Sequence, residues 1–370
     1  MLKIAIDKNP LVSGHKVRGV GRYTKELITS LKKVAKAEIV FRAVDFSRAN
    51  FSKYDVVHVP FFNPIVSKLP EKNLEGIIVT IHDLIPLIYP EVYQAGLSGK
   101  LNFRKQKKLL KKVGGIITPS ETSKKDVVRL LDISEKKVWV VYEAHRAYFT
   151  KVRDENELER VRKKFRLPQK FVLYVGDVNY NKNIPSLVEA CGNLDVKLVI
   201  CGKQALDVDD FGLDLVNLKG PRDWVRFLFN KPHPEISHHG LLGEQFRNNR
   251  GVKRLGFVND RDLLGIYNLA SVYVQPSHYE GFGLSVLEAM SSGTPVVVSR
   301  TNALVEVSGG AAMVADPLNP KDIAKNISKI LKDIRLKNRL VKRGFARSLG
   351  FSWNRAAKET IEVYKAIINS

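Results

Sequence analysis

Short apolar runs alternate with helical patterns along the whole chain, and this alternation constrains the fold more than any other feature. Six runs of strand length occur in the first half, at residues 3–7, 39–41, 56–59, 76–80, 115–118 and 138–141. Six more occur in the second half, at residues 171–175, 196–201, 252–257, 272–275, 295–299 and 312–314. Strands that alternate with helices predict a parallel sheet with helices on both faces, the doubly wound α/β architecture.

The two series are separated by residues 151–170, a highly charged segment that we interpret as a helix and linker. A chain of 370 residues is also too long for one comfortable hydrophobic core. We therefore predict two Rossmann-like domains, residues 1–165 and 166–350, facing across a cleft. A last helix is predicted within residues 351–370, where apolar positions have helical spacing and Ser352 is placed to cap the first turn.

The composition is typical of a globular protein with reduced thiols. Its hydrophobic content is 44%, and no apolar run reaches the ~18 residues of a membrane span. The first residues form a strand pattern rather than a signal peptide, so we expect a cytoplasmic location. Cys191 and Cys201 are the only cysteines, too few for a disulfide framework, and we interpret them as small core residues.

The chain is strongly basic, with a formal net charge of +23 at pH 7. Residues 1–150 carry 27 Lys and Arg against 14 Asp and Glu, and the excess is densest in residues 97–113, from Leu97 to Val113, where seven cations accompany an apolar stripe. A basic helix of this kind is suited to an anionic membrane surface, so we predict peripheral membrane binding there. A solvated helix face is the alternative. Nucleic acid is not expected, because aromatic residues are not interleaved with the cations.

Two carboxylates, Glu280 and Glu288, flank a Gly-Phe-Gly turn in the segment EGFGLSVLE. The turn follows a strand-like run and leads into a helical pattern, and free N–H groups at such a helix start form an anion site. Glu288 is predicted to lie about two turns into the helix, on nearly the same face as Glu280. One carboxylate could hold a sugar and the other a ribose, with a diphosphate on backbone N–H groups between them.

Three further segments place polar groups at predicted strand ends or helix starts. Residues 19–23, GVGRY, put Gly19, Gly21 and Arg22 ahead of a helix, where the backbone can approach a phosphate. His82 follows the strand at 76–80 and is expected at the carboxyl edge of the sheet, where α/β proteins bind ligands. Lys182 follows the first strand of the second series and is suited to reach a diphosphate.

In this order, the segments resemble the motifs of glycosyltransferase family 4 (GT4), retaining enzymes with the GT-B fold that use nucleotide sugars. GVGRY is similar to the family's N-terminal glycine loop, and HDLIP, residues 82–86, to its His-Asp-Leu block. TPSETSK, residues 118–124, is similar to a strand–cap–helix element in which Ser120 or Ser123 caps the helix. EGFGLSVLE resembles the family's E-x7-E signature.

The resemblance implies that the first domain binds the acceptor, that the second binds the donor, and that the last helix crosses back to the first domain. His82 would face the transferred sugar, with Asp83 as an orienting or structural partner. Glu280 would hold the hydroxyls of the donor sugar, and Glu288 would hold the ribose. The remaining donor contacts would come from Gly19, Gly21, Arg22, Lys182, Val258, Gly281, Phe282, Gly283 and Leu284. The family works without a bound metal, so no metal or other cofactor is expected.

The sequence departs from the family in two places. Asn181 stands where most members have an arginine, so only Lys182 remains of that cationic pair. Residues 203–251 are longer than the corresponding family segment and form a predicted insertion, in which Trp224 and the pair Phe227 and Phe229 are suited to contact a partner, an acceptor or a membrane. The histidines of this segment lack the His-Glu-x-x-His spacing of a zinc-binding helix, so no metal site is expected there.

We therefore predict a metal-independent, retaining glycosyltransferase that moves a hexosyl group from a nucleotide-diphosphate sugar to a hydroxyl of a glycan or lipid-linked acceptor. Cell-envelope polysaccharide synthesis is the expected setting. The His-Asp-Leu-Ile-Pro block is most similar to mannosyl- and rhamnosyltransferases, which favours GDP-mannose as the donor. The alternative is a catalytically weak or inactive GT-B protein that binds nucleotide sugars, because the family's arginine is missing. A nucleotide-sugar epimerase and a nucleic-acid-binding protein are less consistent with these motifs.

Overall fold

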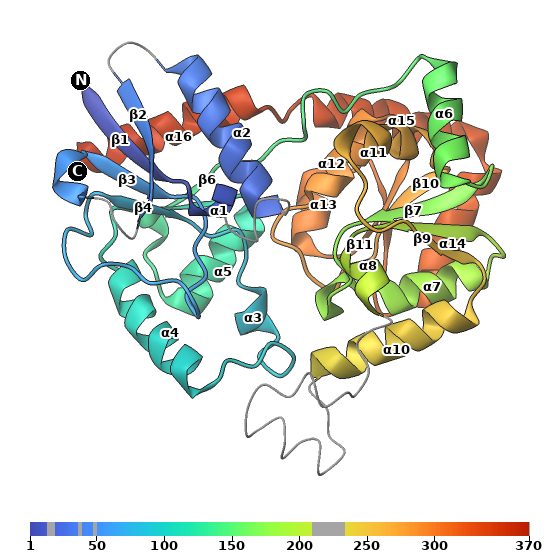
Figure 1. Ribbon diagram of the computed structural model, residues 1–370, viewed down its shortest axis with the longest axis horizontal. Coiled ribbons are helices and arrows are strands. Elements are labelled where there is room, and N and C mark those ends of the chain that lie inside the picture. Colours follow the sequence, from blue (N-terminus) through green and yellow to red (C-terminus); the bar gives the residue numbers. More distant parts are fainter. Residues whose placement is uncertain (13–18, 36–38, 47–49, 209–233, 370) are drawn as a thin grey trace. The chain divides into compact units, whose positions relative to one another are not determined.

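The computed structural model describes residues 1–12, 19–35, 39–46, 50–208 and 234–369. The chain divides into two compact units (Figure 1). The first consists of Met1–Pro90, Gln94–Ala144 and Phe351–Ser370, and the second of Glu91–Tyr93 and His145–Gly350. Each unit is built on its own parallel sheet, so the predicted α/β architecture with two sheets is confirmed.

The sheet of the first unit has six parallel strands in the order β2-β1-β3-β4-β5-β6. All six strands predicted for the first half of the chain are present. Their side chains are almost entirely apolar because helices cover both faces of the sheet, as is usual for parallel sheets. The strands are β1 (Leu2–Asp7), β2 (Ile39–Val44), β3 (Val56–Val59), β4 (Ile77–Thr80), β5 (Gly115–Thr118) and β6 (Val138–Val140).

Helices pack on the two faces of this sheet (Figure 1). The helices α2 (Gly19–Val34) and α16 (Trp353–Ile368) pack against each other on one face, where Leu27, Leu31 and Tyr364 are fully buried. The other face is covered by α4 (Leu97–Leu110) and α5 (Glu121–Leu131), which bury Leu110, Val127 and Leu131. Short elements complete the unit: α1 (Asn9–Val12), α3 (Ile85–Ile88), η1 (Phe51–Lys53) and η2 (Glu135–Lys137).

Helix caps follow the sequence closely. The Ser352 side chain accepts a hydrogen bond from the Arg355 N–H at the start of α16, as predicted for that position. The Ser120 side chain accepts from the Ser123 N–H at the start of α5. The last helix belongs to the first unit, although the residues just before it in the sequence belong to the second.

The sheet of the second unit also has six parallel strands, in the order β12-β11-β10-β7-β8-β9. Successive side chains of β7 alternate between two cores: Val172 and Tyr174 pack in one, Phe171 and Leu173 in the other. The six strands predicted for the second half are all present. They are β7 (Phe171–Val175), β8 (Lys197–Cys201), β9 (Val252–Arg254), β10 (Val272–Gln275), β11 (Val296–Ser299) and β12 (Met313–Ala315).

The helices of the second unit separate into two layers. One core includes residues of α7 (Ile184–Gly192), α10 (Pro234–Asn248) and α14 (Pro320–Lys332), and the other includes residues of α6 (Glu155–Phe165), α11 (Asp260–Leu269) and α12 (Leu284–Ser291). The two cysteines lie in these cores, one in each, and burial raises the pKa of both thiols, as expected for small core residues. The remaining elements are α8 (Gln204–Asp207), α13 (Asn302–Ser308), α15 (Ile334–Ser348) and η3 (Tyr180–Lys182).

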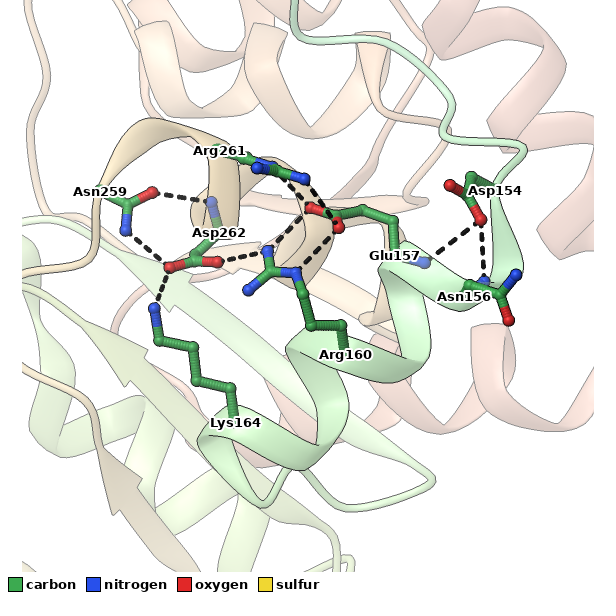
Figure 2. Close-up of polar contacts among 8 residues, drawn as sticks. All are labelled: Asp154, Asn156, Glu157, Arg160, Lys164, Asn259, Arg261 and Asp262. Atoms are coloured by element: carbon green, nitrogen blue, oxygen red, sulfur yellow. Dashed lines mark hydrogen bonds and ion pairs between the residues drawn. The ribbon is translucent and has the colours of Figure 1, made fainter.

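The first boundary between the units differs from the predicted one at residue 165, because the first unit ends at Ala144. Figure 2 shows why α6 belongs with the second unit: Asp262 at the start of α11 accepts hydrogen bonds from Arg160 and Lys164 of α6, at 2.7 and 2.6 Å. Glu157 of α6 accepts two more from Arg261, at 2.9 and 3.1 Å. The sequence predicted a helix and linker at residues 151–170, and α6 is that helix. Its charged side chains hold it against α11 of the second unit.

The predicted insertion at residues 203–251 is also revised at its C-terminal end. Residues 234–248 form α10, which connects β8 to β9 and places Leu242 and Phe246 in the core. It is therefore one of the ordinary covering helices of the sheet. The aromatic residues Trp224, Phe227 and Phe229 lie outside the described residues, and the prediction about them stays a prediction.

No helix in the described part of the chain has the length and apolar character needed to cross a bilayer.

Candidate active site

Glu280 and Lys182 form an ion pair at the carboxyl edge of the second sheet. Lys182 lies at the end of η3, after β7, and its Nζ donates to Glu280 Oε1 and Oε2 at 2.8 and 2.9 Å. Gln275 Nε2 and Ser277 Oγ also donate to Oε1, at 2.8 and 2.6 Å. The carboxylate is 8% exposed, so it is held in one orientation by three neighbours.

The turn between the two predicted carboxylates has a backbone that requires glycine. Gly283 has φ +124°, and a Cβ there would lie 2.8 Å from Leu304 Cδ2. α12 begins directly after it at Leu284, and no side chain caps its start. The Val286 and Leu287 N–H groups donate to the Gly283 carbonyl, so in the described part of the chain the Leu284 and Ser285 N–H groups of the first turn remain for an anion. Gly281 and Phe282, which precede the turn, are both buried.

Glu288 lies in α12, just past the first turn, and not two turns in as predicted, because Glu280 is outside the helix. Its carboxylate is buried and paired with Arg146, whose Nε donates to Glu288 Oε1 at 2.9 Å and whose Nη2 lies 2.8 Å from the same oxygen. Tyr267 OH donates to Oε2 at 3.3 Å. Glu288 is thus fixed from two sides.

Arg146 is itself one of the most constrained cations of the second unit. It is 5% exposed, pairs also with Asp260, and stacks over the Phe149 ring at 3.8 Å. Burial acts against its charge, but the carboxylates of Glu288 and Asp260 outweigh this, so the pKa of Arg146 lies above its usual range. Tyr148 OH donates to the second oxygen of Asp260 at 2.6 Å.

Asn181, which replaces the family's usual arginine, is a buried structural residue. Its Oδ1 accepts from Tyr93 OH at 2.9 Å, its Nδ2 donates to the Tyr279 carbonyl at 3.2 Å, and its own carbonyl accepts from His278 N at 2.8 Å. The side chain therefore joins η3 to the segment that precedes Glu280. The residue contributes no charge, but it helps to place Lys182 beside Glu280.

In the first unit, His82 follows β4 at the carboxyl edge of the sheet, as predicted. Its Nδ1 lies 2.7 Å from Glu143 Oε1 and its Nε2 lies 3.0 Å from the Pro60 carbonyl oxygen. Because a carboxylate and a carbonyl oxygen both accept, these two contacts favour donation from both ring nitrogens, which is the imidazolium form. Burial disfavours this charge, but the hydrogen bond to Glu143 outweighs it, and the pKa of His82 is raised above 6.5.

The residues around His82 have divided roles. Asp83 accepts from the Ile85 N–H at 3.1 Å at the start of α3, so Asp83 is the structural partner and Glu143 orients the ring. Ser123 Oγ donates to the His82 carbonyl at 2.9 Å, which ties the Ser-containing element to the histidine backbone. The Tyr23 ring packs edge-on against the imidazole, 4.6 Å between centroids.

A buried chain of hydrogen bonds lies behind this histidine. Tyr23 OH lies 3.2 Å from Thr80 Oγ1, which lies 2.8 Å from His58 Nε2. His58 Nδ1 lies 2.7 Å from Tyr364 OH in α16. Burial, together with the charge on His82, lowers the pKa of His58 to about 3, so this ring is neutral.

The glycine segment has a different local structure from the expected one, whereas Val258 leaves its backbone for a ligand, as expected. Gly19 and Gly21 do not precede the helix, because α2 already begins at Gly19. Glycine allows the bend but does not force a loop, and Gly21 is buried within the first turn beside the half-buried Arg22. Val258 follows β9, and its side chain is in the core, so only its backbone remains for a ligand.

The histidines of α10 form hydrogen bonds within the protein. His238 Nε2 lies 3.0 Å from the Val178 carbonyl, and His239 Nδ1 lies 2.8 Å from the Glu235 carbonyl. Within the described ranges, no group of three or more His, Cys, Asp and Glu side chains is placed to hold a metal ion. His233 lies outside those ranges.

Sequence reasoning missed Glu143 and Arg146, which hold His82 and Glu288. Both lie in the segment that follows β6, an edge strand of the first sheet, and charged residues that follow a strand of a parallel sheet are a signal for the ligand-binding edge. Which partner each one has could not be predicted, because both contacts join segments that are distant in the sequence.

Comparison with known proteins identifies the family. Residues 36–144 match the model of Glycosyltransferase Family 4, and residues 240–347 match the model of Glycosyl transferases group 1. The chain is 30% identical over 316 residues to the O-antigen chain mannosyltransferase B of Escherichia coli, covering 81% of this chain and 72% of that protein. It is 28% identical over 340 residues to the serotype-specific mannosyltransferase WbdA of Escherichia coli, covering 89% of this chain and 38% of that protein.

Solved structures show the same fold at low sequence identity. Sucrose-phosphate synthase of Thermosynechococcus elongatus superposes with a TM-score of 0.69 at 18% identity, over the full length of both chains. HepE of Anabaena, in complex with UDP and glucose, superposes with a TM-score of 0.67 at 16% identity, over 99% of this chain and 100% of that one. The chain belongs to glycosyltransferase family 4, the mannosyltransferase-like group of enzymes with the GT-B fold.

Proposed function

We propose that this chain transfers a mannosyl group from GDP-mannose to a hydroxyl of a glycan or lipid-linked acceptor, with retention of the anomeric configuration. The observation that carries the proposal is the Lys182–Glu280 pair beside the uncapped start of α12. A cation and free N–H groups suit a diphosphate, and a buried carboxylate beside them suits sugar hydroxyls. The names of the mannosyltransferase relatives favour mannose as the sugar.

On the donor side, each group has a proposed role. Lys182 and the amides of Gly281, Phe282, Gly283 and Leu284 contact the diphosphate. Glu280 accepts from hydroxyls of the sugar, and Glu288, fixed by Arg146, accepts from the ribose hydroxyls. Val258 contacts the nucleotide through its backbone, and Gly19, Gly21 and Arg22 of the first unit add contacts to the donor. None of these roles requires a metal ion or another cofactor.

The hydrogen bonds that His82 and Glu280 already make within the protein support a transfer that retains the anomeric configuration and forms no covalent intermediate. Glu280 is held by three neighbours, and both nitrogens of His82 are occupied as donors. His82 therefore has no free lone pair to act as a nucleophile or general base. Three of the four hydrogen bonds to Glu280 end on Oε1, so Oε2 keeps capacity for the hydroxyl of the sugar. In the proposed step the bond from the anomeric carbon to the diphosphate breaks, the acceptor oxygen bonds to the same face, and the departing phosphate oxygen takes the acceptor proton. His82 contacts the transferred sugar as a fixed positive group.

A ligand screen and a product analysis test this proposal. GDP-mannose at 100 Kd should stabilise the protein by ~2.7 kcal/mol in a thermal-shift assay, more than UDP-, ADP- or dTDP-sugars do. The anomeric configuration of the product, read by NMR, should match that of the donor. Lys182→Met and Glu280→Gln should each lower kcat by ~10²-fold or more, whereas Asp195→Asn, in the turn before β8, should leave it unchanged. Preference for a UDP-sugar, as in the HepE complex, would overturn the choice of base, and binding without transfer would favour the inactive alternative.

We also propose that α4 holds the enzyme peripherally on an anionic membrane, on the cytoplasmic side. Leu97 and Leu101 are 69% and 56% exposed, one helical turn apart, and the cations follow along the same helix. Lys105 pairs with Glu71 at 2.5 Å, and Lys111 pairs with Asp132. By contrast, the part of the chain that the structure describes offers no ion-pair partner to Lys100, Arg104, Lys108 or Lys112, whose charges remain for lipid headgroups.

Vesicle co-sedimentation tests the membrane proposal. The wild type should sediment with vesicles containing phosphatidylglycerol at low salt and be released by high salt. Changing Arg104, Lys108 and Lys112 to Gln should weaken that binding. The matched control changes Lys325, Lys329 and Lys332 of α14 to Gln, with the same loss of charge. If the two triple variants sediment with the vesicles to the same extent, α4 does not bind the membrane and its cations form a solvated helix face.

A further inference from the structure

A cavity of about 200 Å³ lies in the first unit, at the carboxyl ends of three neighbouring strands. Asp7 is the last residue of β1, Phe46 lies just after β2, and Phe61 lies just after β3. These strands are adjacent in the order β2-β1-β3. The cavity is therefore at the edge of the sheet where parallel α/β proteins bind ligands.

The walls of this cavity combine aromatic rings with a few polar groups. Phe46 and Phe61 contribute rings, whereas Asp7, Asn9, Ser67 and Lys68 contribute polar atoms. Small-molecule sites typically have this composition, with apolar surface for contact area and a few polar groups for orientation.

Asp7 is the central polar group. Its side chain is 6% exposed, and its Oδ1 accepts from the backbone N–H groups of Asn9 and Phe46 at 3.1 and 3.2 Å. Both of these bonds end on one oxygen, so Oδ2 keeps capacity to accept from a ligand. Burial raises the pKa of this carboxyl, and nearby Asp45 adds to the effect. A buried carboxyl that keeps accepting capacity favours a ligand with hydroxyl donors.

The cavity lies next to His82. The Phe61 ring, which forms part of the wall, is 6.4 Å from the His82 ring between centroids. A ligand in the cavity would thus be separated from His82 by a single aromatic side chain, within one unit of the protein.

The same features exclude other ligand classes. Asp7 and Asp45 would repel a phosphate or a nucleotide, and Lys68 is at the exposed rim. An acyl chain would desolvate the Asp7 carboxyl without offering it a hydrogen bond. A volume of about 200 Å³ has room for a small ligand such as one sugar ring.

We propose that this cavity binds one pyranose ring of the acceptor glycan, with its C–H face on Phe61 and two of its hydroxyls on Asp7. Ser67 is placed to add a donor: its Oγ accepts from Asn63 N at 2.9 Å, and its O–H has no acceptor among the residues that the structure describes. The inference rests on the proposed glycosyl transfer and adds to it the group that recognises the acceptor.

Acceptor kinetics and direct binding test the subsite. Asp7→Asn keeps the size of the side chain and removes its charge, and Phe61→Leu removes the aromatic face. Each should raise the KM for a mannose oligosaccharide acceptor about 10-fold or more, with a smaller change in kcat and an unchanged donor affinity by calorimetry. The control is Asp55→Asn, an exposed carboxylate of the same unit that accepts from Lys3 N outside the cavity.

Saturation-transfer NMR with methyl α-mannopyranoside supplies a readout that does not require turnover. The wild type and Asp55→Asn should transfer saturation to the sugar, and both cavity variants should lose the signal while keeping their melting temperatures within a few degrees. Normal acceptor KM and normal saturation transfer in a folded Asp7→Asn or Phe61→Leu variant would overturn the subsite. Sugar binding that depends on Asp7 in an enzyme that transfers nothing would instead overturn the proposed function and keep the subsite.

Discussion

At the scale of single residues, Arg146 explains how Glu288 can be buried and still charged. The guanidinium supplies two nitrogens to Glu288 and one to Asp260, and the Phe149 ring supports it from one side. Ionised carboxylates in a protein interior need such a partner, because their desolvation is costly. The Glu288 carboxylate, for which we propose donor binding, is therefore oriented by the protein itself.

Replacing Arg146 with Met is expected to lower the free energy of unfolding by about 3–5 kcal/mol, since it leaves the Glu288 charge buried without its partner. The donor Kd should rise at least ~10-fold as the carboxylate loses its orientation. Denaturant titration and calorimetry measure the two effects. In the double variant Arg146→Met, Glu288→Gln, much of the stability should return, giving a coupling energy above ~1 kcal/mol. Additive losses would show that the pair is not coupled.

His58 makes the stability of the first unit depend on pH. Its pKa is lowered to about 3 from 6.5 in the folded protein, so the unfolded chain binds a proton that the folded chain does not. Above pH 6.5 both states are neutral and His58 costs no stability. As the pH drops from 6.5 toward 3, the free energy of unfolding falls by up to about 1.4 kcal/mol per pH unit. His82 has the opposite sign: its raised pKa stabilises most below pH 6.5, and the effect is lost as the pH rises through the folded-state value.

His58→Gln should therefore flatten the acid side of the stability profile. Glutamine can still bond to Thr80 and Tyr364 but does not titrate in this range. Melting temperatures measured from pH 4.5 to 7.5 should fall less steeply with acid in the variant than in the wild type. An identical slope would show that His58 is not responsible for the acid sensitivity.

At the scale of elements, α6 shows that a charged segment can be a packed part of a domain. Val161 is fully buried in the core, and the Arg160 and Lys164 side chains reach across to Asp262, which is 2% exposed. The Asp154 side chain caps the helix start by accepting from Asn156 N at 3.0 Å (Figure 2). The start of α6 and its packing against α11 are thus determined by charged and polar side chains.

Asp262→Ala should destabilise the second unit by roughly 1–3 kcal/mol, because it removes charge-assisted hydrogen bonds from a buried acceptor. Arg261→Gln is the matched change on the exposed side of the same network, where the arginine is 77% exposed. It should cost less than about 1 kcal/mol, as surface ion pairs do. Chemical denaturation measures the free energy of unfolding of both variants. Equal losses would show that the hydrogen bonds to Asp262 are not the main source of the stabilisation.

At the scale of the whole molecule, the two units are assembled from non-contiguous segments. The first unit takes its last helix from the end of the chain, and the long segment of the second begins at His145, whereas the sequence predicted residue 166, which is 21 positions later (166 − 145). The two strand series stay in chain order, one in each unit, whereas Glu91–Tyr93 and the last helix each belong to a different unit from the residues that precede them.

This division predicts which fragment folds. Residues 145–350 should form a cooperatively folded protein that binds the nucleotide donor, whereas residues 166–350 should not, because they lack α6 and Arg146. Circular dichroism during heating and calorimetry with GDP-mannose would compare them. A shorter fragment that folds and binds as well as the longer one would show that α6 is dispensable.

The sequence alone determined the architecture and the location of the candidate site. Short apolar runs identified the twelve strands of the two described sheets, because buried parallel strands are apolar on both faces. Ser120 and Ser352 were identifiable as caps because a cap acts on backbone two or three residues away. Glu280, Glu288 and His82 could be placed at sheet edges and helix starts for the same local reason.

Only the tertiary structure decided which charges meet. His82 pairs with Glu143 rather than with the adjacent Asp83, and Glu288 pairs with Arg146, which lies 142 positions away in the chain. The same holds for α6, which the sequence predicted as a helix and linker without indicating that Arg160 and Lys164 pair with Asp262. Local sequence patterns specify which charged groups a segment carries. Long-range packing specifies which of these groups are buried against each other, and burial beside a partner determines their charge and orientation.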